Sequence, residues 1–388
     1  MRIALNLIGY AQGCGGVETY VTNLLAALQN IDFENQYIVL CHEDVASSLN
    51  VYAANFSLKT YSYQKYSPRW IMRGLIKRVS GFDILCSELN SLTVDVMHHP
   101  LTVLNPPGLT YPSVLTFHDM QQEFYPEFFS RRELDTRRKS YLPSVHEAHA
   151  IITVSEHAGA CLIEKYGIDA GKIHVVYSGC GDEFCVRDVS TLSEILAKYA
   201  IDRPFILYPA ALWPHKNHQH LLEAVKILVD RGDFDGSLVL TGAPMDAETK
   251  LMKLISRLGL LSRVRWLGYL PKEDIPYLYN LARCMVFPSL FEGFGLPVVE
   301  AMASGCPVIC SENSSIPEVG GEAALYFNPL SSEDIAEKIA LAWNDENLIK
   351  KLKAFGLTQA SKFSWAESAK KTMDVYRLLG DVHLGMFH

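Results

Sequence analysis

A glycine-rich loop between two glutamates is the segment of this sequence best suited to chemistry. It reads FEGFGLPVVEA over residues 291–301 and follows the apolar run CMVFPS, which is expected to be a buried strand. Pro297 favours the first turn of a helix, and Gly305 favours its end. Backbone N–H groups at the start of such a helix bind anions such as phosphate, and the loop glycines let a ligand approach the backbone closely. The segment therefore predicts an anion site at the end of a strand.

The two glutamates of this segment add carboxylate acceptors for hydroxyl groups. Glu300, expected in the first turn of the helix, can accept from a vicinal diol such as that of a ribose. Glu292, in the loop, can accept from the hydroxyls of a sugar that lies against the loop amides. Each glutamate alone has a simpler interpretation, since Glu300 would complement the helix dipole and Glu292 would be a solvated loop residue. Together with the glycine loop, they favour a functional site.

The elements that must position this segment alternate between short apolar runs and amphipathic stretches. This alternation is typical of parallel sheets covered by helices on both faces, so the expected fold class is α/β. It breaks once, in a polar stretch after residue 184, and restarts at RPFILYPAAL. A chain of 388 residues also exceeds one ordinary core. The predicted parts are a first domain (1–184), a linker (185–203), a second domain (204–364), and a C-terminal helix and tail (365–388) that can return to the first domain.

Composition excludes some classes of function. The formal net charge of −8 argues against a general nucleic-acid binder, whose charge would be basic and concentrated on one face. The nine cysteines include no CxxC pair, which favours free thiols in a reducing cytoplasm. No apolar run is long enough to span a bilayer, so any membrane association is expected to be peripheral, at the inner face of the membrane.

The Glu-x7-Glu pattern of residues 291–301 resembles the signature of retaining glycosyltransferases of family 4, which have the GT-B fold. The resemblance covers nearly the whole chain, because further segments similar to that family occur in the same order. They are GGVETYVTNLLAAL (15–28), TFHD (116–119), IITVSEHA (151–158), IHVVYSG (173–179), PHKNHQHLLEAV (214–225), LVLTG (238–242) and RVRWLGYLP (263–271). The resemblance implies two Rossmann-like domains that face each other across a deep cleft, with the nucleotide-sugar donor on the second domain.

The resemblance also implies roles for single residues. Lys216 neutralises the diphosphate of the donor, Glu292 contacts hydroxyls of the donor sugar, and His118 lies near that sugar; these three are the catalytic candidates. Glu300 binds the ribose. The other donor-binding candidates are the glycines of a first loop that closes over the donor (Gly15, Gly16), the amides that bind sugar and phosphate (Phe294, Gly295, Leu296), and the residues beside the base (Tyr269, Leu270).

One position departs from the family pattern. The family commonly has an arginine five residues before the lysine, where this sequence has Ala211. His215, Arg263 or Arg265 are candidates for a compensating charge. The departure concerns the affinity for the donor rather than the reaction class.

No metal or other cofactor is expected. Asp233-Phe234-Asp235 matches the DxD pattern of metal-dependent transferases, but it lies in a polar stretch between a helix and a strand, where aspartate is common in turns. The histidines at 215, 218 and 220 lack further fixed ligands, and Lys216 lies among them. The expected small-molecule partner is therefore the nucleotide sugar, which is a substrate.

Residues 67–82, SPRWIMRGLIKRVSGF, form a basic amphipathic stretch of open interpretation. Arg69, Arg73 and Lys77 recur at helical spacing, and the segment has no acidic residue. Such a helix can dock on an anionic membrane surface, or it can cover the sheet of the first domain. The basic residues of 131–139 add charge, and a lipid-linked acceptor would suit both features.

The sequence thus predicts a retaining transferase that moves a hexose to a glycan or lipid-linked acceptor in polysaccharide biosynthesis. UDP-glucose is the slightly preferred donor, with GDP-mannose second, because no residue identifies the base. Two alternatives stay open. They are a nucleotide-sugar epimerase of the same architecture, and a non-catalytic subunit that binds nucleotide sugars.

Overall fold

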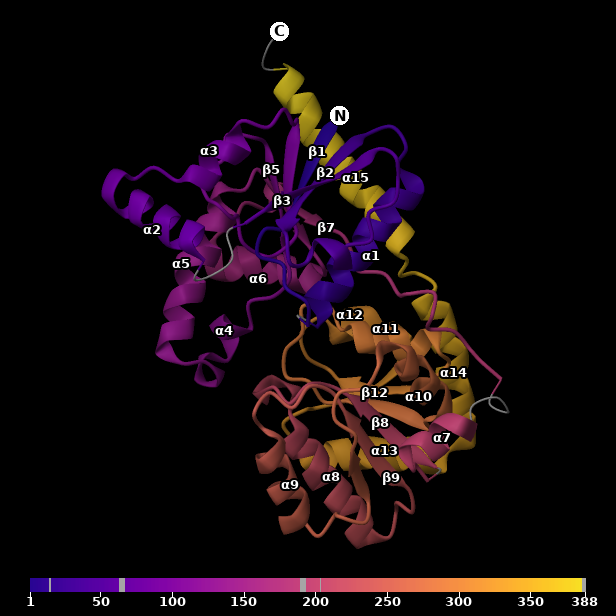
Figure 1. The fold of residues 1–388 in the computed structure, drawn as a ribbon. Coiled ribbons are helices and arrows are strands. Elements are labelled where there is room, and N and C mark those ends of the chain that lie inside the picture. The colour runs from indigo at the N-terminus through magenta and orange to yellow at the C-terminus, as the bar shows by residue number, and fades with distance from the viewer. Residues whose placement is uncertain (14, 63–66, 189–192, 203, 386–388) are drawn as a thin grey trace. The chain divides into compact units, whose positions relative to one another are not determined.

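The computed structural model describes residues 1–13, 15–62, 67–188, 193–202 and 204–385. Contacts divide the chain into two compact units, whose elements are labelled in Figure 1. One unit comprises Met1–Gly179 and Trp365–His388, and the other comprises Cys180–Ser364. Parts of the predicted linker and tail, residues 189–192, 203 and 386–388, lie outside the described residues.

The first unit is built on a parallel sheet of seven strands in the order β3-β2-β1-β4-β5-β6-β7. β1 pairs with β2 on one side (Arg2↔Gln36) and with β4 on the other (Ile3↔Val96), so the strand order reverses between β1 and β4. β5 and β6 are buried along their whole length, as expected for strands covered on both faces. The strands are β1 (Arg2–Asn6), β2 (Gln36–His42), β3 (Phe56–Tyr61), β4 (Val96–His99), β5 (Ser113–Phe117), β6 (Ala150–Thr153) and β7 (Ile173–Val175).

The helices of this unit include one from the far end of the chain. That helix, α15 (Trp365–Gly385), packs on α1 (Gly16–Ile31). The buried Tyr376 hydroxyl of α15 lies 2.7 Å from Nδ1 of the buried His98 in β4. The return of the last helix to the first domain is therefore confirmed. The other helices are α2 (Pro68–Ser80), α3 (Ile84–Asn90), α4 (Gln121–Phe124), α5 (Arg131–Glu147) and α6 (Glu156–Tyr166).

The second unit repeats this design with a parallel sheet of six strands in the order β10-β9-β8-β11-β12-β13. Its strands are β8 (Phe205–Pro209), β9 (Ser237–Thr241), β10 (Val264–Trp266), β11 (Cys284–Phe287), β12 (Val308–Ser311) and β13 (Ala324–Phe327). Its helices are α7 (Ser193–Tyr199), α8 (His218–Arg231), α9 (Glu248–Arg257), α10 (Ile275–Leu281), α11 (Leu296–Ala303), α12 (Ile316–Gly320), α13 (Ser332–Asn344) and α14 (Glu346–Ala360).

The predicted fold class, α/β with two parallel-sheet domains, is confirmed by these two sheets. Within the described part of the chain, no helix combines the length and the apolar character that a bilayer crossing requires. The cysteines described there are all free thiols.

Candidate functional site

The predicted donor residues of the second unit, apart from Tyr269 and Leu270, lie after two neighbouring strands. β8 and β11 are adjacent (Cys284↔Ile206, Met285↔Leu207), with β9 and β10 on one side of the pair and β12 and β13 on the other. The strand order therefore reverses between β8 and β11. The carboxyl ends of two such strands form the usual ligand position of an open α/β sheet.

The loop after β8 carries Lys216. A short 3₁₀ turn, Pro214–Lys216, ends at Asn217, which has a left-handed φ of 58° and is buried. The Asn217 side-chain amide donates to the carbonyls of Pro288 at 3.1 Å and Pro329 at 2.7 Å. These bonds tie the lysine loop to the loop that follows β11, so the position of Lys216 is set by the second loop.

Lys216 and Glu292 form an ion pair across the two loops. Lys216 Nζ lies 2.5 Å from Glu292 Oε1, and the two side chains are only 16% and 13% exposed. Ser289 Oγ donates to the same carboxylate oxygen at 2.5 Å. Because water screens a largely buried pair weakly, the ammonium and the carboxylate hold each other in place. The structure thus brings together two of the three catalytic candidates.

The glycine-rich loop is held by serines from the segment after β12. Ser314 Oγ accepts from the Glu292 N–H at 3.0 Å. Ser315 Oγ donates to the carbonyls of Glu292 at 3.0 Å and Phe294 at 2.9 Å. The Phe294 ring is buried and packs against Phe363, so Phe294 can offer only its backbone to a ligand.

The helix after this loop begins where the sequence predicts. Gly295 precedes α11 with a φ of 106°, a conformation that favours glycine. Leu296 is the first helical residue and Pro297 the second. The first N–H groups of a helix have no intrahelical acceptor and carry a partial positive charge. The start of α11 can therefore bind an anion.

Glu300 occupies a different turn from the one predicted. It is the fifth residue of α11, so the expected first-turn position is wrong, and the alternative that Glu300 complements the helix dipole, an effect of the first turn, does not apply. The Tyr279 hydroxyl donates to Glu300 Oε2 at 3.2 Å. Burial raises the pKa of Glu300 from 4.5 to about 7, against the lowering effect of this hydrogen bond. A half-buried carboxyl poised near neutrality can accept strongly from a ligand hydroxyl once ionised.

Tyr269 and Leu270 follow the edge strand β10. The loop is fixed by the Gly268 carbonyl, which accepts from Thr241 Oγ1 at 2.7 Å and from the Gly242 N–H at 2.8 Å. Tyr269 is 65% exposed, so its ring can stack on a base, whereas the Leu270 side chain is buried. The predicted base contact thus falls on one exposed aromatic ring.

Neither arginine suggested as a replacement for the arginine missing at Ala211 serves that purpose. Arg263 donates to the carbonyls of Asp235 and Gly236, which precede β9. Arg265 donates to the carbonyl of Tyr199, at the end of α7. Both guanidinium groups are bound near the amino ends of the strands, away from the loop of Lys216. The proposed compensation by these two residues is wrong.

The remaining candidates belong to the first unit. Gly15 precedes α1 with a φ of 61° and a ψ of −126°, Gly16 begins the helix, and both glycines are exposed. His118 follows β5, and its Nε2 lies 2.8 Å from the Pro100 carbonyl, so Nε2 carries the proton. Burial lowers the pKa of His118 to about 4. The ring is therefore neutral near pH 7 and keeps Nδ1 as an acceptor.

A cavity in the first unit was not predicted as a site. It has a volume of about 190 Å³ and lies where the strand order reverses between β1 and β4. Thr102, in the loop after β4, has a φ of 68°, which is uncommon for a β-branched residue and concentrates at functional sites. The lining residues are Asn6, Ile8, Gly9, His99, Leu101, Val103 and Asn105.

A buried histidine, His99, lines this cavity. The ring is almost fully buried, and Nδ1 accepts from the Asn105 N–H at 3.4 Å, which leaves the proton on Nε2. Nε2 has no hydrogen-bond partner among the residues that the structure describes. Burial lowers the pKa of His99 to about 3, so it is neutral. From the sequence, the run His98-His99-Pro100 is interpreted as the end of a strand, with lining of the acceptor side of a cleft as the alternative, and β4 does end at His99.

The structure describes no group of three or more histidine, cysteine, aspartate or glutamate side chains that could hold a metal ion, within the ranges given above. Asp235 of the DxD-like triplet accepts from Trp343 Nε1 at 3.0 Å, and Phe234 packs on the same indole. His220 Nδ1 contacts Asn217 Oδ1 at 2.5 Å. These residues have structural partners that account for them.

Comparison with known proteins matches both units to glycosyltransferases. Residues 14–183 match the model of Glycosyltransferase Family 4, and residues 193–358 match that of Glycosyl transferases group 1. O-antigen chain mannosyltransferase B of Escherichia coli is 34% identical over 268 residues, which are 69% of this chain and 70% of the relative. The chain belongs to glycosyltransferase family 4. It is a glycosyltransferase enzyme.

Further comparisons agree with this assignment. O-antigen chain mannosyltransferase RfbU of Salmonella typhimurium is 28% identical to this glycosyltransferase over 240 residues, 62% of each chain. A crystal structure of Anabaena Alr3699/HepE in complex with UDP and glucose matches with a TM-score of 0.76 at 18% identity. That match covers 97% of this glycosyltransferase and 99% of the other chain, and it supports the GT-B fold.

Proposed function

We propose that this glycosyltransferase transfers mannose from GDP-mannose, with retention of anomeric configuration, to a glycan or lipid-linked acceptor during the synthesis of a surface polysaccharide. The relatives named above are O-antigen chain mannosyltransferases. This proposal reverses the order of donors favoured from the sequence, because these relatives are mannosyltransferases. The earlier preference for UDP-glucose rested on no specific residue. The 18% identity to the UDP-bound structure supports the fold and not the donor.

The Lys216–Glu292 ion pair beside the start of α11 is the observation that supports this function most strongly. The diphosphate of the donor would be bound by the ammonium of Lys216 and by the amides around Phe294, Gly295 and Leu296. Glu292 would then accept from hydroxyls of the sugar. Glu300 would accept from the ribose, and the exposed Tyr269 ring would stack on the base.

We propose a transfer step that uses this arrangement. The bond between the anomeric carbon and the diphosphate oxygen breaks, while the acceptor oxygen forms a bond to the same carbon from the same face. The acceptor proton passes to the departing phosphate oxygen. Negative charge grows on that phosphate, and Lys216 and the helix start stabilise it. These groups supply the positive charge, so we propose that transfer needs no metal ion.

The acceptor would be bound by the first unit. The cavity is lined by the neutral His99, by side-chain amides and by apolar side chains, which suit a sugar better than an anion. His118, neutral with Nδ1 as an acceptor, follows the adjacent strand β5 and is proposed to contact the donor sugar.

Donor assays test this function. Thermal-shift measurements with GDP and UDP, followed by incubation with GDP-mannose or UDP-glucose and a mannan-type oligosaccharide, compare binding with turnover. We expect stabilisation by GDP and a product mass increased by one hexose from GDP-mannose. Stabilisation by UDP alone would contradict the donor. Conversion of the donor to an epimer without acceptor, or binding without turnover, would contradict the transfer.

A further inference from the structure

Helix α2 (Pro68–Ser80) of the first unit is exposed in an unusual way for an amphipathic helix. None of its residues is buried. Ser67 caps its start by accepting from the Trp70 N–H at 3.1 Å, and Gly81 ends it in a left-handed conformation. The helix is thus well formed by local signals. Among the described elements, α3 is the main packing partner of α2.

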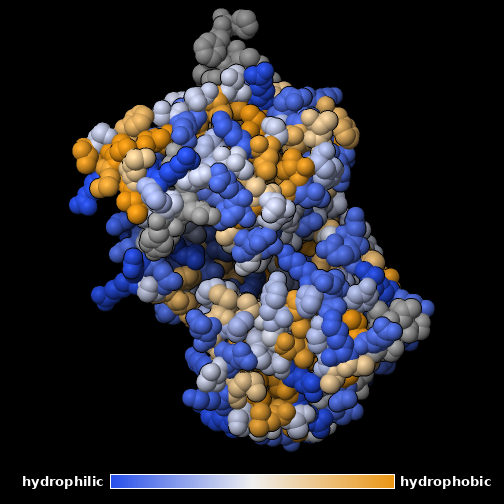
Figure 2. Space-filling model, viewed as in Figure 1, coloured by the Kyte–Doolittle hydropathy of each residue, from blue (hydrophilic) through white to orange (hydrophobic). Residues whose placement is uncertain are grey.

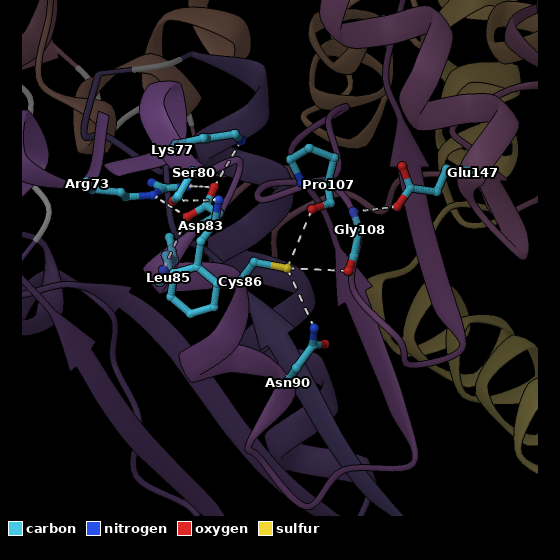
Figure 3. Close-up of polar contacts among 11 residues, drawn as sticks. Arg73, Lys77, Ser80, Asp83, Leu85, Cys86, Asn90, Pro107, Gly108 and Glu147 are labelled. Carbon is cyan, nitrogen blue, oxygen red and sulfur yellow. Dashed lines mark hydrogen bonds and ion pairs between the residues drawn. The ribbon is translucent and has the colours of Figure 1, made fainter. Parts of the chain in front are cut away.

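The side of α2 that faces the protein is polar. Arg73 and Lys77, one turn apart, both bind the Asp83 carboxylate, which caps α3 (Ile84–Asn90). The distances are 2.6 Å for Arg73 and 2.9 Å for Lys77, and Figure 3 shows both side chains directed at Asp83. Burial alone would raise the pKa of Asp83, but the hydrogen bonds from these two cations hold it well below its usual range. This cluster fixes the rotation of α2 about its axis.

The base of α2 is rigid. Leu85 and Leu89 of α3 are buried in a core cluster beneath it. Cys86 Sγ lies 3.3 Å from the Gly108 carbonyl, and the Gly108 N–H donates to Glu147 at the end of α5 (Figure 3). The helix is therefore held on a fixed support, and its outward face is a defined feature of the fold.

The outward side of α2 is apolar. At 100° per residue, Ile71, Leu75 and Val79 form a stripe opposite Arg73 and Lys77. Leu75 is 59% exposed and Val79 is 86% exposed, and Figure 2 shows apolar side chains gathered over this helix. The polarity is the inverse of that of a helix which covers a core. The interpretation of residues 67–82 as a helix that covers the sheet is wrong.

One arginine borders this apolar stripe. Arg78 lies beside Ile71 at its edge, whereas Arg69 lies nearer to the side of Arg73; both are exposed and form no ion pair with a residue that the structure describes. The segment 67–82 contains no aspartate or glutamate. A partner for this face must therefore be apolar at its centre and negatively charged at its rim. A bilayer containing anionic phospholipid has this chemistry.

We propose that α2 is a membrane-docking helix, which inserts Ile71, Leu75 and Val79 into the interface of an anionic bilayer while Arg78 contacts lipid phosphates. Arg73 and Lys77 hold the helix to the protein through Asp83. This inference is independent of the proposed donor. It assigns to the first unit a surface on which a lipid-linked acceptor would be presented.

Vesicle binding by the whole chain tests this assignment. Sedimentation with phosphatidylcholine vesicles, with and without phosphatidylglycerol, is expected to show binding that requires the anionic lipid and falls as salt is raised. Arg78→Gln should weaken binding about fivefold. Leu75→Gln with Val79→Gln should weaken it by on the order of tenfold or more.

Matched substitutions on the second unit serve as controls. Leu261 and Arg257 are also exposed, so Leu261→Gln and Arg257→Gln repeat the chemistry elsewhere and are expected to leave vesicle binding unchanged. All variants should keep the thermal stability of the parent chain, because no side chain of α2 is buried. Equal loss of binding in the control variants would overturn the proposal.

Light scattering distinguishes the main competing occupant. If the parent chain self-associates, if Leu75→Gln with Val79→Gln yields monomers, and if no vesicle binding occurs at low salt, then α2 is an interface between copies and the membrane assignment is overturned. Vesicle binding that survives both sets of α2 substitutions would overturn it equally. Loss of transfer activity alone decides nothing about this surface, so lipid binding is measured without substrates.

Discussion

The two units share one architecture but differ in charge at the point where the strand order reverses. In the second unit, the ends of β8 and β11 carry an ion pair, a glycine-rich loop and the start of α11. In the first unit, the ends of β1 and β4 surround a cavity of about 190 Å³ with amides, apolar side chains and the neutral His99. The same sheet geometry therefore presents a charged site once and a neutral site once.

On the proposed function, this difference would separate the two substrates of the transferase. A diphosphate needs positive charge and converging N–H groups, and Lys216 and the start of α11 would supply them in the second unit. A sugar hydroxyl needs uncharged polar partners, and the residues that line the cavity would supply them in the first unit. The sheets would then determine where ligands bind, and the loop residues would determine which ligand binds.

Removal of the lysine ammonium should have the largest effect. Lys216→Met keeps most of the side-chain volume but removes the charge beside the diphosphate, so kcat/KM should fall about 10²–10³-fold in a steady-state transfer assay. Lys226→Met, on the exposed part of α8, is the matched control and should retain activity. Near-parental turnover by Lys216→Met would break the comparison, because the charged site would then not be the donor site.

A change of pH should affect nucleotide binding less than the loss of the Lys216 charge affects turnover. Since the pKa of Glu300 is about 7, GDP affinity should rise from about pH 6 to about pH 8 as the carboxylate ionises and accepts from the ribose. Glu300→Gln should weaken binding about tenfold at the higher pH and abolish this pH dependence. Calorimetric titrations of GDP into the parent chain and Glu300→Gln at the two pH values measure these affinities. An unchanged pH profile in Glu300→Gln would exclude the ribose contact.

The same carboxyl should affect folding stability. Its pKa is higher in the folded chain than the ordinary 4.5, so the folded state binds the extra proton between these values. Its contribution to the free energy of unfolding is fully present below about pH 4.5 and is lost as the pH rises through about 7. Denaturant titrations should show that Glu300→Gln flattens this loss. A steeper loss in the variant would contradict the raised pKa.

Replacement of the cavity histidine should have the smallest effect and the most selective one. His99→Leu replaces a polar lining residue of an uncharged pocket by an apolar one, so the acceptor KM should rise about fivefold while the donor KM stays unchanged. Kinetics with each substrate varied in turn separate the two constants. A rise in the donor KM instead would assign the cavity to the wrong substrate.

The fold could be predicted from local patterns that the structure retains. Apolar runs such as 205–209 and 284–287 became buried parallel strands, and Pro297 and Gly305 mark the ends of α11 correctly. The return of α15 was anticipated only as a possibility, because its contact with His98 spans most of the chain. Hydrophobic periodicity predicts each helix or strand. It does not predict which distant element in the sequence packs against it.

The site was predicted where a motif keeps its residues close in sequence. The loop of 292–296 is such a case, whereas the pairing of Lys216 with Glu292 needed the adjacency of β8 and β11. Glu300 was placed one turn too early, because it is the fifth residue of α11; its carboxylate accepts from Tyr279 and does not lie at the helix start. The cavity that His99 lines was not predicted, because it is formed by the loops after β1 and β4, which are about ninety residues apart in the sequence.

Calorimetric titration of GDP into the parent chain, Lys216→Met and His99→Leu tests most directly whether the charged site of the second unit binds the donor. The account predicts that Lys216→Met weakens GDP binding by about tenfold or more, whereas His99→Leu binds GDP like the parent chain. Parental affinity in Lys216→Met together with weakened affinity in His99→Leu would contradict it, since the nucleotide would then be bound by the neutral site.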